Sequence, residues 1–224
     1  MRSAAILIAV GVCAAAGCGG SSGTSTTSAP VTSSADSPAP GCSPADVPAA
    51  RKDGGAKPPT QRLEPGRTYK LVFATNCGSF TITLDQAQSP AASASLVSLA
   101  RAGFFDNTVF HRIVPGFVIQ GGDPTQSGTG GPGYKTTDTP PAGARYVKGV
   151  VAMAKTQAES AGTAGSQFFV VTGADIGLPP DYAIVGKVTS GLAVVERIGK
   201  LGDPATELPT QPVVNQKVEV VAQP

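Results

Sequence analysis

The chain has 224 residues, a formal net charge of +2 and only 14% charged side chains. This length suits one domain with appendages better than two full domains. Lysine and arginine do not cluster with aromatic residues, so the charge pattern argues against a nucleic-acid partner. His111 is the only histidine, which excludes a histidine-cluster metal site, and we expect neither a metal nor a cofactor.

Residues 1–17 have the pattern of a bacterial export signal. Arg2 provides a basic start, and residues 4–16 form an apolar stretch too short for the roughly 20 residues that cross a bilayer. The segment ends in Ala15-Ala16-Gly17-Cys18, which resembles a lipobox. We therefore expect a lipid on Cys18 that anchors the exported protein to the outer face of the cell membrane. The alternatives are an ordinary secretory signal, or lipidation at Cys13.

Residues 18–67 are expected to form a disordered tether and N-terminal extension. The stretch from Gly19 to about Pro40 is rich in Ser, Thr, Gly, Ala and Pro, and it buries too little apolar surface to offset its ordering entropy. Cys42 follows this stretch, and Cys77 lies in a polar turn. Export permits a disulfide between them, with two free thiols as the alternative. Neither cysteine has a partner base for catalysis.

Residues 68–224 are expected to form the globular domain. Residues 69–75 and 80–84 predict a hairpin, and Ser89-Pro90 predicts the start of a helix that ends at Gly103. Short strands are then expected at residues 109–113, 117–120, 149–154, 167–171 and 184–188, a second helix at 190–198 and a last strand at 213–221. Many short strands with two helices predict a mainly β fold, a closed antiparallel barrel with plugged ends.

Five segments follow one another in a characteristic order. They are residues 110–123 (FHRIVPGFVIQGGD), 128–131 (GTGG), 153–154 (MA), 165–169 (GSQFF) and 184–188 (IVGKV). Together they resemble the motifs of the cyclophilin family of peptidyl-prolyl cis-trans isomerases, and the resemblance extends from about residue 69 to residue 221.

The resemblance implies an eight-stranded antiparallel barrel capped by two α-helices, with a groove that binds proline-containing segments. It implies that Arg112 is the catalytic arginine and that no cofactor is needed. It places the substrate-binding positions at Phe117, Val118, Gln120, Met153, Ala154, Lys155, Gln167, Phe169, Leu178 and Tyr182. We expect a monomeric isomerase that assists the folding of exported proteins.

Physical chemistry supports an arginine in this role. Rotation about an amide bond loses resonance and has a barrier of about 18–20 kcal/mol. In the twisted transition state the prolyl nitrogen regains a lone pair, to which a fixed guanidinium can donate. Such a bond is stronger in the transition state than in either ground state, as catalysis requires. Arginine suits this better than lysine because its planar fork holds its direction and stays protonated.

Several residues leave alternatives open. Phe117 and Phe169 fit a barrel core as well as a proline pocket. Gly177 stands where many cyclophilins carry a tryptophan, Tyr182 where they carry a histidine, and Lys155 where an asparagine is frequent. These departures motivate a second reading, in which the domain binds proline-containing segments or acts as a chaperone without catalysis. A Ser-His-Asp hydrolase is disfavoured because no suitable base accompanies a nucleophile.

Overall fold

The computed structural model describes residues 41–224, which belong to one compact unit. The predicted signal, Cys18 and the stretch up to Pro40 lie outside the described residues. Within residues 41–224, every helix is too short or too polar to cross a membrane.

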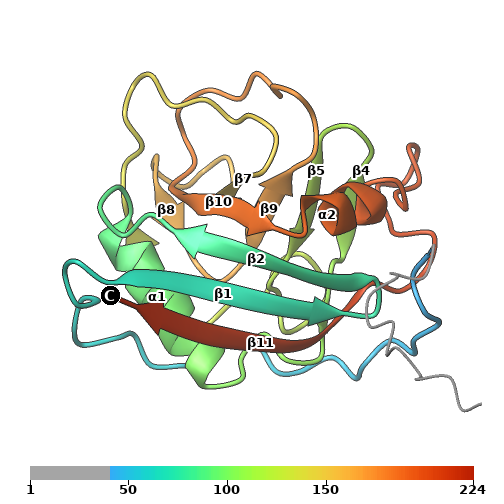
Figure 1. The fold of residues 1–224 in the computed structure, drawn as a ribbon, viewed down its shortest axis with the longest axis horizontal. Helices are drawn as coiled ribbons and strands as arrows, with labels where there is room; N and C mark the ends of the chain where they lie inside the picture. The colour runs from blue at the N-terminus through green and yellow to red at the C-terminus, as the bar shows by residue number, and fades with distance from the viewer. Residues whose placement is uncertain (1–40) are drawn as a thin grey trace, which may run out of the picture. The chain divides into compact units, whose positions relative to one another are not determined.

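A curled antiparallel sheet forms most of the domain (Figure 1). Its nine strands run in the order β3-β11-β1-β2-β10-β7-β9-β5-β4, and β6 and β8 form a separate pair. The strands are β1 (Thr68–Thr75), β2 (Gly78–Leu84), β3 (Thr108–Val109), β4 (Arg112–Val114), β5 (Val118–Gly121), β6 (Thr136–Thr137), β7 (Val150–Met153), β8 (Thr163–Ala164), β9 (Phe168–Val171), β10 (Ile184–Ser190) and β11 (Val214–Gln223).

The two edges of this sheet are joined by consecutive residues. Edge strands β3 and β4 are separated in the chain only by Phe110 and His111. The N–H of Phe110 donates to the carbonyl of Val213 at 3.0 Å, and the N–H of Ile113 donates to the carbonyl of Glu207 at 2.8 Å. The predicted mainly β fold with two helices is thus confirmed. The main sheet has nine strands and not eight because the strand expected at residues 109–113 is split in two, and the unpredicted pair β6 and β8 brings the total to eleven.

The hairpin of β1 and β2 shows how the sequence pattern forms the core. Burial alternates along β1, as expected of a strand with one face inward. Phe73 and Phe80 are directly opposite in the register, and their rings stack with centroids 4.9 Å apart. Phe168 of β9 contacts this pair, with its ring centroid 5.4 Å from that of Phe73. Aromatic rings therefore pack together in the core, among the aliphatic side chains of the same cluster.

Two helices cover the sheet, α1 (Pro90–Arg101) and α2 (Leu192–Ile198). Pro90 begins α1 as predicted, but the hydroxyl of Ser89 donates to the carbonyl of Ile184 at 2.7 Å and does not cap the helix. The carboxylate of Asp138 instead accepts from the N–H of Ala92 at 2.6 Å. A distant residue therefore caps α1, and local sequence could not show it.

Residues 41–67 form what we call the N-terminal strap, drawn in blue in Figure 1 along the domain. A disulfide joins Cys42 to Cys77 in the turn between β1 and β2, as predicted. Ala56 and Leu63 pack against the core. The strap is thus ordered against the domain, unlike the disordered segment expected up to residue 67. Composition did not predict this order, because the hydrogen bonds and the disulfide that hold the strap join it to residues far along the chain.

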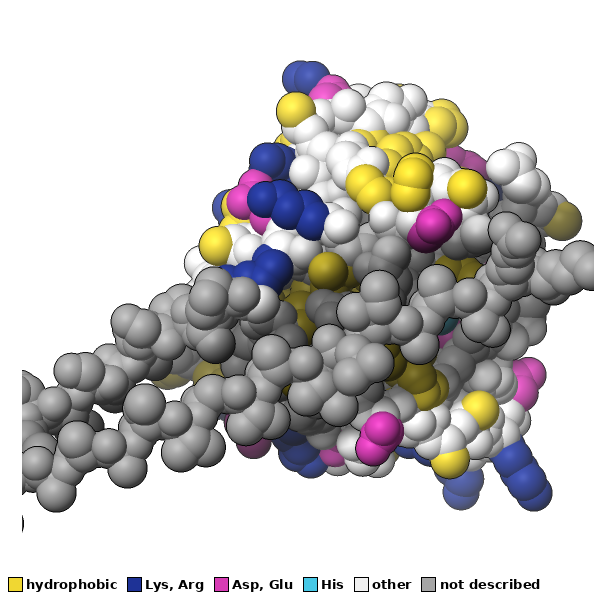
Figure 2. Space-filling view, turned by 90° about the vertical axis from the view of Figure 1, so that its right-hand side faces the viewer, with side chains coloured by type: hydrophobic (Ala, Val, Ile, Leu, Met, Phe, Trp, Pro, Cys, Tyr) yellow, Lys and Arg dark blue, Asp and Glu magenta, His cyan; other side chains and the backbone are white. Residues whose placement is uncertain are grey.

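The face on the right-hand side of Figure 1 is turned toward the reader in Figure 2. Where described side chains are visible in this view, Lys and Arg side chains lie beside Asp and Glu side chains.

Candidate active site

One cavity on the barrel wall brings together most of the predicted site residues. It is lined by Arg112, Phe117, Val118, Gln120, Ala154, Lys155, Phe169, Leu178 and Tyr182. The sheet register explains how residues so distant in sequence meet. Arg112 on β4 is opposite Gln120 on β5, which is opposite Phe169 on β9, which is opposite Ala152 on β7. The four positions form one row across four strands.

The floor of this cavity is apolar and aromatic. Val118 and Phe169 are buried, and they belong to a small hydrophobic cluster distinct from the main core. Phe117 and Leu178 are half-buried and pack against that cluster. The ring of Tyr182 meets that of Phe169 edge-on, with centroids 5.5 Å apart. An apolar seat of this kind suits a proline ring, which presents only C–H groups to it.

Arg112 lines the cavity with its guanidinium fixed at two points. Its Nε donates to the carboxylate of Glu207 at 2.6 Å, and its Nη1 donates to Oε1 of Gln120 at 3.3 Å. Among residues 41–224, no acceptor takes a hydrogen bond from Nη2. The guanidinium thus combines a fixed direction with a donor group available to a bound molecule.

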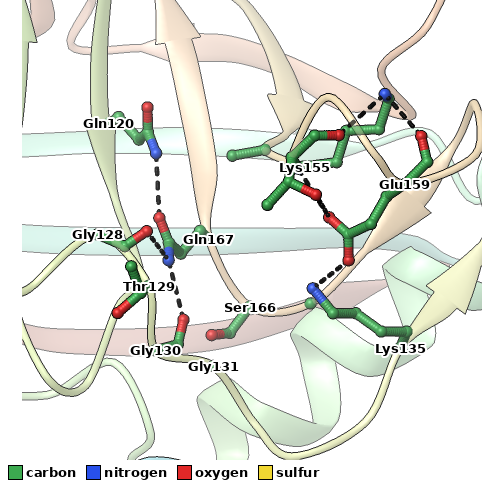
Figure 3. Close-up of a pocket in the computed structure, with 13 residues that line it drawn as sticks. Gln120, Gly128, Thr129, Gly130, Gly131, Lys135, Lys155, Glu159, Ser166 and Gln167 are labelled. Carbon is green, nitrogen blue, oxygen red and sulfur yellow. Dashed lines mark hydrogen bonds and ion pairs between the residues drawn. The ribbon is translucent and has the colours of Figure 1, made fainter.

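A chain of side-chain amides continues from Gln120 (Figure 3). Its Nε2 donates to Oε1 of Gln167 at 3.0 Å. Nε2 of Gln167 in turn donates to the carbonyls of Gly128 and Gly130, both at 2.9 Å. The arginine is therefore linked through two glutamines to the glycine-rich loop at residues 123–133.

Lys155 lies at the cavity edge as a buried ammonium group. Its side chain is only 2% exposed, and its Nζ lies 2.5 Å from the carboxylate of Asp181. Nζ also donates to the carbonyl of Glu159 at 3.0 Å (Figure 3) and lies 5.4 Å from the ring centroid of Tyr182. This pairing offsets the cost of burying the charge and ties two loops of the cavity wall together.

We expect Asp181→Asn to lower the free energy of unfolding by about 2 kcal/mol. Breaking a fully buried ion pair costs about 3–5 kcal/mol, and the value is smaller here because Asp181 is 36% exposed. Urea unfolding followed by circular dichroism measures the change. Glu196→Gln, which breaks the exposed pair with Lys148, is the matched control and should cost less than about 1 kcal/mol. Equal losses in the two variants would contradict the buried-pair argument.

Most of this chain matches one family of known proteins. Residues 70–220 match the family described as cyclophilin type peptidyl-prolyl cis-trans isomerase/CLD. The chain belongs to this family. Peptidyl-prolyl cis-trans isomerase-like 1 of Gibberella zeae is 35% identical over 158 residues, which are 69% of this chain and 96% of that protein. The probable peptidyl-prolyl cis-trans isomerase B of Mycobacterium leprae is 38% identical over 165 residues, or 63% of this chain and 55% of that one.

A solved cyclophilin-type isomerase of Cryptosporidium parvum superimposes with a TM-score of 0.63 at 28% identity. The match covers 70% of this chain and 99% of that chain. The same Cryptosporidium protein has also been solved in the presence of the dipeptide Ala-Pro, and that structure covers 68% of this chain.

Two predicted site residues of this cyclophilin lie away from the cavity that Arg112 lines. Met153 has no exposed surface and belongs to the main core, so it supports the wall from behind and does not line it. Side chains alternate along β7, so Val151 and Met153 join the main core whereas Ala152 between them joins the small cluster under the cavity. Gln167 lines the adjoining hollow shown in Figure 3, which shares Gln120, Ala154 and Lys155 with the first cavity.

Glu207 is a site residue that the cyclophilin motifs do not indicate. It follows Arg112 by 95 positions and lies in the loop before β11. Its backbone has φ 59°, and its N–H donates to the carbonyl of Asp203 at 2.8 Å. Because few non-glycine residues adopt this conformation, the contacts of the surrounding loop must hold the backbone of Glu207 in it. No local pattern in the sequence distinguishes it from other surface glutamates.

Asp123 and His111 lie beneath the glycine-rich loop. Buried Asp123 accepts hydrogen bonds from the N–H of Thr125 at 2.7 Å and the N–H of Gly128 at 2.6 Å. Burial raises the pKa of Asp123, but these hydrogen bonds and that of Gly130 outweigh it and hold the pKa below its ordinary value. Burial lowers the pKa of His111 below 6.5, although Asp123 opposes the shift.

We expect the free energy of unfolding to fall as the pH decreases through about 6.5. The folded state holds the pKa of His111 below its ordinary value of 6.5, so the unfolded chain binds this proton first and acid favours unfolding. Because His111 is the only histidine, His111→Gln should flatten the dependence between about pH 7.5 and 5.5. Chemical unfolding of both proteins at several pH values measures it. An identical slope in the variant would contradict the assignment.

Proposed function

We propose that this cyclophilin isomerises Xaa-Pro bonds by holding the proline ring on its apolar floor under the guanidinium of Arg112. The observation that carries the proposal is the fixed guanidinium, whose Nη2 has no acceptor among residues 41–224, at a cavity floored by Val118 and Phe169. The Ala-Pro dipeptide with which the Cryptosporidium relative was solved supports a proline-containing ligand.

The chemistry requires no covalent step. The floor holds the proline ring while the chain on the other side of the bond turns. As the amide twists, its nitrogen becomes pyramidal, and Nη2 of Arg112 donates to the emerging lone pair. The side-chain amide of Gln120 lies beside Arg112 and positions the backbone of the bound segment. The donor makes its strongest bond at the twisted state, so the barrier of about 20 kcal/mol falls.

We further propose that the protein acts on exported proteins from a lipid anchor at Cys18. The disulfide between Cys42 and Cys77 supports export, because disulfides persist in oxidising compartments. Uncatalysed prolyl isomerisation takes tens to hundreds of seconds and can limit folding there. Mass spectrometry of the membrane fraction tests the anchor, with Cys18→Ala as the variant that should appear in the soluble exported fraction. An unmodified wild-type N-terminus would refute it.

The proposed active form is a monomer. One chain supplies Arg112, both hydrogen-bond partners of its guanidinium and the apolar floor, so a single copy holds the groups that the proposed mechanism uses. Sedimentation at working concentrations tests the point, and a stable dimer would contradict it.

NMR exchange spectroscopy on a proline peptide tests the enzymatic proposal. We expect the full chain to accelerate cis-trans exchange far above the uncatalysed rate. The competing function is a non-catalytic binding module or chaperone. The buried Lys155–Asp181 pair and Tyr182 at the cavity edge favour it, because Lys155 and Tyr182 depart from the residues frequent at these positions in cyclophilins. Peptide-induced shifts without faster exchange would support the binding module and refute catalysis.

A further inference from the structure

The N-terminal strap reaches the glycine-rich loop that holds the amide chain of the site. The N–H of Arg51 donates to the carbonyl of Pro124 at 2.8 Å, and Nε2 of Gln126 donates to the carbonyl of Pro48 at 2.8 Å. These two bonds fasten the strap to the first part of the loop. The strap precedes residues 70–220, so it lies outside the region that matches the family.

A second set of bonds fastens the other part of the loop. The N–H of Gly131 donates to Oδ1 of Asp53 at 2.7 Å, and the N–H of Gly54 donates to the carbonyl of Gly131 at 3.0 Å. The N–H of Ala56 donates to the carbonyl of Pro132 at 3.1 Å. Both the N–H and the carbonyl of Gly131 are therefore hydrogen-bonded to the strap.

The two backbones approach each other closely at this point. A Cβ added to Gly133, which has φ +90°, would lie 3.0 Å from Cα of Gly54. Only glycine tolerates both this conformation and this contact. The strap therefore packs on the loop without an intervening side chain.

The loop residues beside Gly131 are those that hold Gln167. The carbonyl of Gly130 accepts from Nε2 of Gln167 at 2.9 Å, and Oε1 of Gln167 accepts from Gln120 (Figure 3). Gln120 accepts in turn from Arg112. An unbroken series of hydrogen bonds thus runs from the strap to the guanidinium.

We propose that the N-terminal strap is a positioning element of the isomerase site, in which Asp53 fixes Gly131 and the loop carbonyls so that Gln167, Gln120 and Arg112 keep their alignment. The proposal rests on the proposed function of Arg112. Asp53 is exposed and does not line the cavity, so it acts through the loop and not on the substrate. Small misalignments of catalytic groups lower rates strongly, so a contact that only aligns them can still affect the rate.

The test compares two aspartates of the strap in the full chain. Asp53→Ala removes the acceptor of the Gly131 N–H, and we expect kcat/KM for a proline peptide to fall about fivefold, which corresponds to about 1 kcal/mol, the net worth of one ordinary hydrogen bond. Asp53→Asn retains an acceptor oxygen and should restore most of the activity. Asp46→Ala is the matched control, because Asp46 is exposed on the same strap and its side chain makes no hydrogen bond within residues 41–224.

A double-mutant cycle separates positioning from general destabilisation. If Asp53 acts through Gln167, Asp53→Ala should cause no further loss in a Gln167→Ala background. Full additivity of the two losses would overturn the proposal. So would equal activities of the Asp53→Ala and Asp46→Ala proteins.

A readout independent of turnover distinguishes this proposal from the function on which it rests. In the unliganded chain, Asp53→Ala should shift the NMR signals of the Gln167 and Gln120 side-chain amides and of the Arg112 Nε–H, whereas Asp46→Ala should not. Unmoved signals would overturn the positioning role even if the chain is an active isomerase. Moved signals in a chain without isomerase activity would support the positioning role and refute the proposed catalysis.

Discussion

Arg112→Ala should lower kcat/KM for a proline peptide by about 10²-fold. The variant removes the donor expected to strengthen its bond in the twisted state, and the loss of one such donor typically costs about 10²–10³-fold. The apolar floor remains, so peptide affinity should change much less than the rate. NMR exchange spectroscopy measures the rate and peptide titration measures the affinity.

Arg112→Lys separates charge from geometry. Lysine keeps the positive charge but lacks the planar fork that reaches Glu207 and Gln120 together. We expect activity to remain at least about tenfold below that of the wild type. Arg101→Ala is the matched control, because Arg101 is exposed at the end of α1 and does not line the cavity. Wild-type rates in Arg112→Ala would remove the arginine from the mechanism.

The motifs predicted residues that meet in one cavity, because the sheet register brings their strands side by side. Arg112, Gln120 and Phe169 belong to strands whose pairing follows from the fold, so a correct fold places them in one row. The physical argument for an arginine above an apolar seat needed only these residues. Short strands with two helices were likewise readable from alternation and helix starts.

The cap of α1, the partner of Arg112 and the order of the strap could not be predicted from the sequence, because they depend on contacts between distant segments. Asp138 caps α1 from 47 positions beyond Ala91, and Glu207 holds Arg112 from a loop with no motif. Strap residues 41–67 are short of large apolar groups, and their order comes from backbone bonds to the loop and from the disulfide. The composition of a segment indicates how much apolar surface it can bury by itself, but not which contacts another segment will make with it.

Cys42→Ser should lower the free energy of unfolding by about 3–4 kcal/mol. The bridge closes a loop with a sequence separation of 35, and a cross-link of that size removes about this much entropy from the unfolded chain. Urea unfolding of the oxidised protein and the variant measures the loss. Dithiothreitol should lower the stability of the wild type to that of the variant and leave the variant unchanged. Equal stability of oxidised wild type and variant would contradict the argument.

The native contacts around the bridge should survive its removal. The N–H of Ser43 donates to the carbonyl of Asn76 at 2.8 Å, and Nδ2 of Asn76 donates back to the carbonyl of Ser43 at 2.8 Å. Because these bonds do not require the sulfur atoms, the variant should keep the strap in place when folded. The loss then arises mainly in the unfolded state, where the freed strap gains conformations. The folded variant should therefore retain isomerase activity while it unfolds at lower urea concentration, which separates the disulfide's effect on stability from the effect of Asp53 on alignment.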